Sequence, residues 1–269
     1  MFYEGTEKRL LICTKTLNLF HFEDTFWQEL VAHSGAEILS RISNSTLKAY
    51  LLSESSLFIW RDKLLLITCG NTQLVKAALF IQQRFTKQQI NTLIFQRHQS
   101  LKPQLQNSTF QQDCLLLDET FNGQQQHWRD DYQGDLFAFG KITSNTITTQ
   151  SIYMLHGLRG ELADKLQKQT LSKEFILEKL KLKTFFNDLL IDHFSFNPKG
   201  YSLNAICGEN YLAIHLTPEK WSTYLSIETS FSVIQCSEFI SYIKKIFLPE
   251  KTKKMHFKPT TQGLEIIIN

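Results

Sequence analysis

A short polar break, Ser53-Glu54-Ser55-Ser56, lies between two apolar runs in the first quarter of the chain. A tight turn between two strands places the Ser55 hydroxyl beside the Glu54 carbonyl, which the hydroxyl can attack. The acyl group then moves from nitrogen to oxygen, and β-elimination opens the resulting ester and leaves a pyruvoyl group at residue 55. Read alone, a serine-rich break is more often an ordinary surface turn.

Three further segments favour the chemical interpretation. They are Tyr3 to Lys8, Thr68-Cys69-Gly70, and Phe196 to Asn204 followed by His215-Leu216-Thr217-Pro218-Glu219. Together with Leu52 to Phe58 they resemble the eukaryotic-type S-adenosylmethionine decarboxylases, in order and with near-family spacing. The likeness runs over residues 3 to about 80 and about 190 to 230, and is loose from about 100 to 185 and near the C-terminus. Four ordered motifs make a specific signal, whereas each alone is weak.

The composition favours one globular domain. A chain of 269 residues can bury a sizeable core. Its 29 basic and 26 acidic residues leave a net charge of +3, which is too small to demand nucleic acid or an anionic membrane as a partner. The start of the chain carries Glu4 and Glu7 where a signal peptide needs a basic residue and an apolar middle, and no apolar run approaches a membrane span. We expect neither nucleic-acid nor membrane binding.

The five cysteines predict no disulfide framework and no metal site. They are odd in number and widely spaced, and they include no Cys-x-x-Cys pair. This usage is typical of a reducing compartment, so we expect a cytoplasmic protein.

Hydrophobic periodicity predicts the elements that hold the motifs. Strands are expected at residues 10–13, 20–22, 46–52, 57–60, 64–68, 91–95, 211–216, 224–228 and 255–258, with a turn at residues 61–63. Helices are expected from an N-cap at Asp24 to Gly35, from a cap at Asn71 or Thr72 through residue 80, and at residues 237–247. The Gln- and Asn-rich residues 104–126 are expected to include a surface loop near Asn122-Gly123.

The order of hairpin, helix and strand occurs twice, which hints at a duplicated unit. The resemblance implies an α+β fold, a four-layer α/β/β/α sandwich of two antiparallel sheets flanked by helices, for the single domain of residues 1–269.

The resemblance also places self-cleavage between Glu54 and Ser55, which gives a beta chain of residues 1–54 and an alpha chain of residues 55–269 from the same precursor. Ser55 would become the pyruvoyl cofactor, whose ketone forms a Schiff base with the substrate amine and whose amide extends the electron sink. Glu54 is also placed among the substrate-binding residues.

Three more residues receive chemical roles by resemblance. Ser202 and His215 serve processing, as the oxyanion-stabilising polar group and the base of the ester step. Cys69 donates the proton to the α carbon of the product. From pattern alone, a strand histidine and a lone strand-end cysteine are more often core residues.

The substrate-binding residues follow in the same way. Tyr3 and Phe196 match the aromatic pair that sandwiches adenine, although the family usually has Phe where this chain has Tyr3. Glu219 matches the acceptor for the ribose hydroxyls. Glu4 and Glu7 match active-site acids, whose separate roles the spacing does not assign.

The likeness weakens where animal members bind putrescine. Glu228 matches one of their acids, but Leu11 occupies a second position and Ser151 to Met154 lacks the others. An unpaired diammonium would not be retained there, so we predict no putrescine activation. A dimer is compatible with the family but is not implied by this shorter chain.

The leading hypothesis is pyruvoyl-dependent decarboxylation of S-adenosylmethionine, which supplies the aminopropyl donor for spermidine and spermine synthesis. One alternative keeps the pyruvoyl group but decarboxylates arginine or ornithine, and the adenine-stacking pair and Glu219 argue against it. Another is a non-catalytic regulatory partner of a paralogous decarboxylase, which would need none of Ser55, Cys69, Ser202 and His215. A nucleic-acid-binding α+β module has only the basic pI in its favour.

Overall fold

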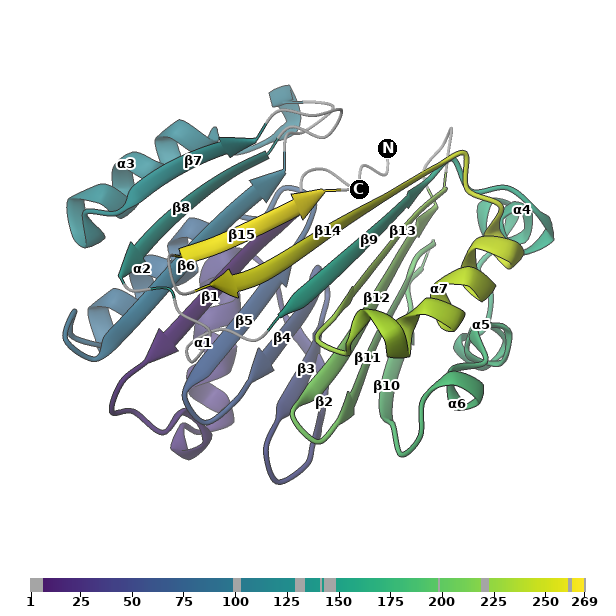
Figure 1. Cartoon of the computed structure of the whole chain (residues 1–269), viewed down its shortest axis with the longest axis horizontal. Coiled ribbons are helices and arrows are strands. Elements are labelled where there is room, and N and C mark those ends of the chain that lie inside the picture. Colours follow the sequence, from purple (N-terminus) through teal and green to yellow (C-terminus); the bar gives the residue numbers. More distant parts are fainter. Residues whose placement is uncertain are drawn as a thin grey trace. The chain divides into compact units, whose positions relative to one another are not determined.

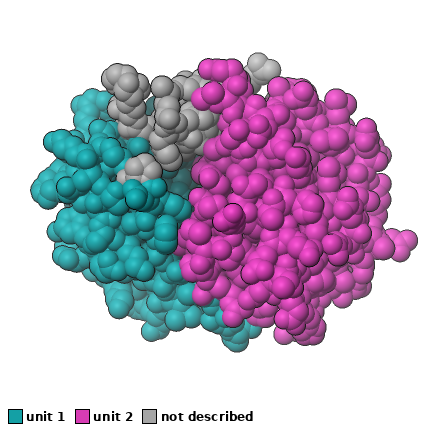
Figure 2. All heavy atoms as spheres, turned by 180° about the vertical axis from the view of Figure 1, so that it is seen from behind, with its two compact units in different colours: residues 1–3, 42–47, 143–269 teal, residues 4–41, 48–142 magenta. Residues whose placement is uncertain are grey.

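The computed structural model describes residues 7–98, 103–128, 134–140, 142, 149–197, 199–218, 223–260 and 263–268. The chain divides into two compact units (Figure 2). We call residues 4–41 and 48–142 the N-terminal unit, and residues 1–3, 42–47 and 143–269 the C-terminal unit. Each unit is built on one antiparallel sheet with helices packed on it (Figure 1), which confirms the α+β class with two antiparallel sheets flanked by helices.

The sheet of the N-terminal unit has eight strands in the order β2-β3-β4-β5-β1-β6-β8-β7. The strands are β1 (Lys8–Thr14), β2 (Ile38–Ser43), β3 (Lys48–Leu52), β4 (Ser55–Ile59), β5 (Lys63–Thr68), β6 (Ile90–His98), β7 (Gln124–Trp128) and β8 (Gly134–Gly140). The helices are α1 (Asp24–Ser34), α2 (Leu74–Arg84) and α3 (Phe110–Phe121), and short 3₁₀ turns occupy η1 (Leu19–His21) and η2 (Pro103–Leu105).

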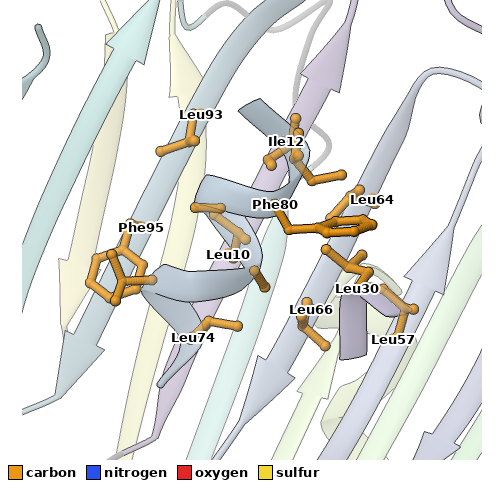
Figure 3. Packing of buried hydrophobic residues seen from close by; sticks show 14 of the residues in the cluster. Leu10, Ile12, Leu30, Leu57, Leu64, Leu66, Leu74, Phe80, Leu93 and Phe95 are labelled. Carbon is orange, nitrogen blue, oxygen red and sulfur yellow. The ribbon is translucent and has the colours of Figure 1, made fainter. Parts of the chain in front are cut away.

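Alternation along the strands builds the core of this unit. Leu10 and Ile12 of β1 point to the helices, as do alternate residues of β4, β5 and β6. Figure 3 shows Phe80 of α2 and Leu30 of α1 packed against these strand residues. A polar side chain in register with these residues is therefore buried under the helices.

The C-terminal unit has seven strands in the order β10-β11-β12-β13-β9-β14-β15. They are β9 (Gln150–His156), β10 (Leu190–Ser195), β11 (Tyr201–Cys207), β12 (Asn210–Pro218), β13 (Thr223–Thr229), β14 (Lys251–Thr260) and β15 (Gly263–Ile268). Helices α4 (Glu161–Lys168), α5 (Lys173–Leu180), α6 (Leu182–Phe185) and α7 (Val233–Phe247) share one apolar core with the sheet.

The two sheets repeat one topology. In each, the first strand along the chain (β1 or β9) lies between the fifth strand (β5 or β13) and the strand that follows the next helix (β6 or β14). Helix α2 thus corresponds to α7, and the β3–β4 hairpin corresponds to the β11–β12 hairpin. The repeated strand order supports the predicted duplication.

Most predicted elements are present, and the differences have local causes. Residues 20–22 were expected to be extended, but Phe20 and His21 lie in the 3₁₀ turn η1, where the Asn18 side chain accepts from the Phe20 amide, and only Phe22 is extended. The N-cap position of helix α1 is Glu23, which makes no side-chain cap hydrogen bond, and Asp24 is the first helical residue and accepts from Arg41. Neither Asn71 nor Thr72 caps α2, which starts after Gln73.

The loosely matched middle of the chain contains elements that the pattern did not predict. Strands β7 to β9 and helices α3 to α6 were missed there, and strands β2, β10, β11 and β15 were missed elsewhere in the chain. Within the Gln-rich residues 104–126, α3 takes up most of the length, and the predicted break at Asn122-Gly123 is the end of that helix, with Asn122 at a φ of 50°.

Candidate active site

The Ser53-Glu54 pair forms a two-residue hairpin turn between β3 and β4, with Leu52 opposite Ser55. The turn is anchored at Ser53, whose amide donates to the Glu37 carbonyl at 2.9 Å. The Ser53 hydroxyl in turn accepts from the Glu37 amide at 3.0 Å. The turn residues Ser53 and Glu54 are half-buried, but Ser55 is only 4% exposed, so the hydroxyl that the chemical interpretation needs lies inside the protein rather than on its surface.

Ser55 has a strained backbone. Its φ is 135°, in a region that residues with a Cβ atom rarely adopt. Such strain persists only where the surrounding structure enforces it, and it raises the energy of the intact chain at the Glu54–Ser55 bond. A rearrangement that breaks this bond relieves it.

The amide and the thiol of Cys69 both contact the carbonyl oxygen of Glu54. The Cys69 amide donates to it at 3.1 Å, and the Cys69 thiol lies 3.6 Å from it. Donors on a carbonyl oxygen polarise it and stabilise the negative charge that develops there when a nucleophile adds. The predicted proton donor therefore contacts the carbonyl group that directly precedes the predicted nucleophile in the chain.

Cys69 follows the last residue of β5 and is held in a tight turn. The Thr72 hydroxyl lies 2.9 Å from both the Thr68 hydroxyl and the Cys69 carbonyl. Gly70 has a φ of 61°, which suits a residue without a side chain. The buried Lys8 ammonium donates to the Gly70 carbonyl at 3.0 Å.

Burial shapes the ionisation of the groups around this turn. Desolvation raises the pKa of Glu54, although the Cys69 thiol and Lys8 act in the opposite direction. Desolvation, and after it the Arg97 charge, lowers the pKa of Lys8 to about 8. Glu7, the residue before β1, is 7% exposed, so this predicted active-site acid is buried.

In the C-terminal unit, Ser202 of β11 and His215 of β12 are cross-strand partners. The Ser202 oxygen lies 3.0 Å from Nδ1 of His215. Burial lowers the pKa of His215 to about 4, so the imidazole is neutral near pH 7 and can accept a proton. The structure brings these two predicted processing residues together.

The remaining predicted residues divide into two groups. Phe196 follows β10, and its ring packs edge-on against Phe194 with centroids 5.0 Å apart. Tyr3, Glu4 and Glu219 lie outside the described residues. Their roles therefore stay predictions.

Glu228, the residue that matches an acid of the putrescine site in animal members, is buried and only 1% exposed. Its carboxylate accepts from the Tyr211 hydroxyl at 2.7 Å. Leu11 is a buried apolar residue of β1. The prediction of no putrescine activation remains open to measurement.

Sequence reasoning missed two buried cations near Cys69. Lys8 is 1% exposed and Arg97 is 6% exposed. Both share the strand parity of core residues, Lys8 with Leu10 and Arg97 with Phe95. A charged residue in register with core leucines and phenylalanines was the signal that could have revealed them.

Within the parts of the chain that the structure describes, no three His, Cys, Asp or Glu side chains are grouped as a metal site. The same residues include no helix with the length and hydropathy needed to cross a membrane.

Comparison with known proteins finds relatives that cover most of this chain. The S-adenosylmethionine decarboxylase proenzyme of Trypanosoma cruzi is 28% identical over 277 residues, which cover 92% of this chain and 73% of the relative. The Xenopus laevis proenzyme is 26% identical over 285 residues, which cover 93% of this chain and 81% of the relative. Among solved structures, the Trypanosoma brucei AdoMetDC-delta26 monomer shares the fold, with a TM-score of 0.58 at 23% identity over 75% of this chain and 79% of that one.

The sequence model of one family, adenosylmethionine decarboxylase, matches residues 1–264. Since that match spans nearly all of the 269 residues, this chain belongs to the adenosylmethionine decarboxylase family.

Proposed function

We propose that this chain is a proenzyme that cuts itself between Glu54 and Ser55 and then decarboxylates S-adenosylmethionine. The observation that supports this most directly is the conformation at the scissile bond. Ser55 is strained at a φ of 135°, and the preceding carbonyl oxygen accepts from the Cys69 amide at 3.1 Å. Strain and a polarised carbonyl both favour attack by the adjacent hydroxyl.

The first stage is an acyl shift. The Ser55 oxygen bonds to the Glu54 carbonyl carbon, the bond from that carbon to the Ser55 nitrogen breaks, and the hydroxyl proton passes to the nitrogen. The product is an ester with a free amine at residue 55. The Cys69 amide and thiol bind the oxyanion during this stage, and Ser202 adds a further polar group.

The second stage is elimination. His215 removes the α proton of Ser55, the bond from Cβ to the ester oxygen breaks, and Glu54 leaves as a C-terminal carboxylate. The new N-terminus is an enamine, which takes up water and releases ammonia to become the ketone. Residues 1–54 and 55–269 then remain associated as the beta and alpha chains.

The surroundings of residue 55 fit this group, because the hairpin buries it and keeps a thiol near the carbonyl that is cut. Once formed, the pyruvoyl ketone binds the substrate amine and accepts the electrons released with carbon dioxide. Cys69 then delivers a proton to the α carbon of the product. Its thiol lies 3.6 Å from the Glu54 carbonyl oxygen, within reach of the bond that is cut.

Recognition of the substrate is assigned to Tyr3, Phe196 and Glu219, with Glu4, Glu7 and Glu54 as acids of the site. The two rings stack on adenine, and Glu219 accepts from the ribose hydroxyls. The product would serve as the aminopropyl donor for spermidine and spermine in the cytoplasm. The close Ser202–His215 pair supports catalysis over a purely regulatory role, because a regulatory partner has no need of it.

The mass of the denatured purified protein tests the proposal. We expect two fragments, one that ends at Glu54 and one that begins at residue 55 with a blocked N-terminus. The protein should also release carbon dioxide from S-adenosylmethionine. A single intact chain, or two fragments with a free serine terminus, would refute the proposed chemistry.

A further inference from the structure

The turn that carries Cys69 is gripped by a distant segment of the same unit, residues 103–109. The side-chain amide of Gln106 donates to the Gly70 carbonyl at 3.2 Å. The neighbouring Asn107 donates to the Asn71 carbonyl at 2.7 Å. Two consecutive residues of this Gln- and Asn-rich segment thus bind the two residues that follow Cys69.

Gln106 is itself oriented by a buried ion pair. Arg97 donates to the Gln106 side-chain oxygen at 3.3 Å and to the Ser108 carbonyl at 2.5 Å. It also pairs with the carboxylate of Asp113, 2.7 Å away and 2% exposed. Because Arg97 can only donate, the Gln106 oxygen must face it and the Gln106 amide must face Gly70. The network fixes which way the Gln106 side chain points.

The Gly70 carbonyl therefore receives donors from two directions, Lys8 at 3.0 Å and Gln106 at 3.2 Å. Cys69 is the residue directly before Gly70, and both its amide and its thiol reach the Glu54 carbonyl oxygen. A shift of Gly70 therefore moves the Cys69 amide and the Cys69 thiol relative to that oxygen. Displacement of such groups by even about 1 Å can lower a rate substantially.

We infer that Gln106 is a positioning residue, which aligns Cys69 with the carbonyl of the scissile bond and, after cleavage, with the carbon to be protonated. This inference rests on the proposed function. It assigns a role to residue 106, for which the sequence analysis predicted none.

The test replaces Gln106 with Glu or Ala and uses Gln104, an exposed residue of the same segment, for matched Gln104→Glu and Gln104→Ala controls. In Gln106→Glu the side chain still accepts from Arg97, but an ionised carboxylate has no hydrogen to donate to Gly70. Three quantities are measured: the rate of self-cleavage of fresh precursor, its melting temperature, and the fraction of 55–269 chains whose N-terminal residue is alanine after turnover.

We expect self-cleavage of both Gln106 variants to slow by about threefold to tenfold, as for loss of one hydrogen bond at a reacting group. More alpha chains should carry an N-terminal alanine after each turnover, because a misplaced thiol protonates the pyruvoyl carbon instead of the α carbon of the product. The melting temperatures should match those of the Gln104 controls. A purely structural role would lower the melting temperature without changing the alanine fraction.

The outcomes separate this inference from the proposed function. If the unaltered chain neither cleaves nor decarboxylates, the proposed function fails. If it does both and the Gln106 variants behave as the Gln104 variants do, the positioning role is refuted. Should the Gln106 variants not fold, the exposed Asn107→Ala decides, with a smaller change in the same two readouts expected and none refuting the role.

Discussion

Ser55 is both the proposed nucleophile and a strained residue, so its substitutions separate chemistry from stability. Ser55→Ala and Ser55→Gly should both remain single chains, because neither has a hydroxyl. Since the φ of 135° suits only glycine, the Ser55→Gly precursor should be more stable than the Ser55→Ala precursor by about 1 kcal/mol. Urea unfolding of the two uncleaved proteins measures this difference.

Ser56 provides the matched control, because it is fully buried in the same strand and is not among the residues with positive φ. There the order should reverse, with Ser56→Gly less stable than Ser56→Ala, since glycine loses more chain entropy in a strand. Equal stabilities of the two Ser55 variants, or a cleaved Ser55→Ala protein, would contradict the assignment.

His215 should act as a base over an unusually wide pH range. Its pKa is lowered to about 4, so it stays neutral as the pH falls from 7.5 to 5.5, whereas an ordinary histidine would lose about tenfold of its base form. Self-cleavage should therefore change little over this range. The fold binds fewer protons here than the unfolded chain, so its stability falls below about pH 6.5, and circular dichroism must accompany each rate.

His215→Ala should stall as an ester that hydroxylamine cleaves, because the acyl shift does not need the base. His256→Ala is the control, since His256 also pairs with a serine across a strand of the same sheet, with 2.8 Å to Ser151. A His215→Ala chain that resists hydroxylamine entirely, or one that processes like His256→Ala, would argue against this role.

Cys69→Ala should still cleave, because the Cys69 backbone amide that binds the Glu54 carbonyl remains. Loss of the thiol should slow decarboxylation by about 10²-fold or more and increase the fraction of alpha chains whose N-terminal residue is alanine. Mass spectrometry of the large fragment after a fixed number of turnovers measures that fraction. Cys207→Ala, a partly buried cysteine of the other unit, should behave as the unaltered protein, and equal behaviour of the two variants would exclude Cys69 as the donor.

At the scale of elements, the Arg97–Asp113 ion pair joins β6 to α3. Its side chains are 7% and 3% exposed, against 54% and 57% for the surface pair of Arg84 and Glu29. Asp113→Ala leaves a buried guanidinium without its carboxylate and should lower the free energy of unfolding by about 3 kcal/mol. Glu29→Ala should lower it by less than about 1 kcal/mol. Urea unfolding of both variants in a Ser55→Ala background compares them, and equal losses would be inconsistent with this account.

Strands and helices with regular periodicity were predictable from sequence, and those set by side-chain contacts were not. The β3, β4 and β5 strands and the α2 and α7 helices carry a clear apolar period. In the 3₁₀ turn η1 the Phe20 amide donates to the Asn18 side chain, a contact that the Phe-His-Phe pattern does not reveal.

The candidate site divides in the same way. Ser55, Cys69, Ser202 and His215 were identified by resemblance to family motifs, whereas the contact between Ser202 and His215 came only from the structure. The cluster of Lys8, Arg97 and Gln106 was not predicted, because Lys8 of β1 lies far in sequence from β6 and from the loop that follows it. Only a fold that aligns β1 between β5 and β6 brings them together.

At the scale of the whole molecule, two copies of one topology carry different halves of the proposed chemistry. The turn of the first hairpin, Ser53-Glu54, is followed by Ser55, whereas the matching turn of the second hairpin, Gly208-Glu209, is followed by Asn210. The second hairpin instead carries Ser202 and His215 within its strands. If the units arose by duplication, the nucleophile and the base specialised in separate copies.

Substrate recognition should be separable from self-cleavage in this arrangement. Phe196→Ala and Glu219→Ala should weaken use of S-adenosylmethionine by about tenfold or more, because each removes a contact to the nucleoside. Both precursors should still cleave, since neither residue takes part in the acyl shift. Phe194→Ala, which removes the ring beside Phe196 (centroids 5.0 Å apart), tests whether loss of packing alone has this effect.

Carbon dioxide release from fully processed protein is then measured with S-adenosylmethionine, ornithine and arginine, each with and without putrescine. We expect release from S-adenosylmethionine alone and no stimulation, because Leu11 offers no acid to a diammonium and Glu228 already accepts from Tyr211 at 2.7 Å. Preference for ornithine or arginine would overturn the substrate assignment. Strong stimulation by putrescine would instead show that acids other than those matched to the animal enzymes bind the diamine.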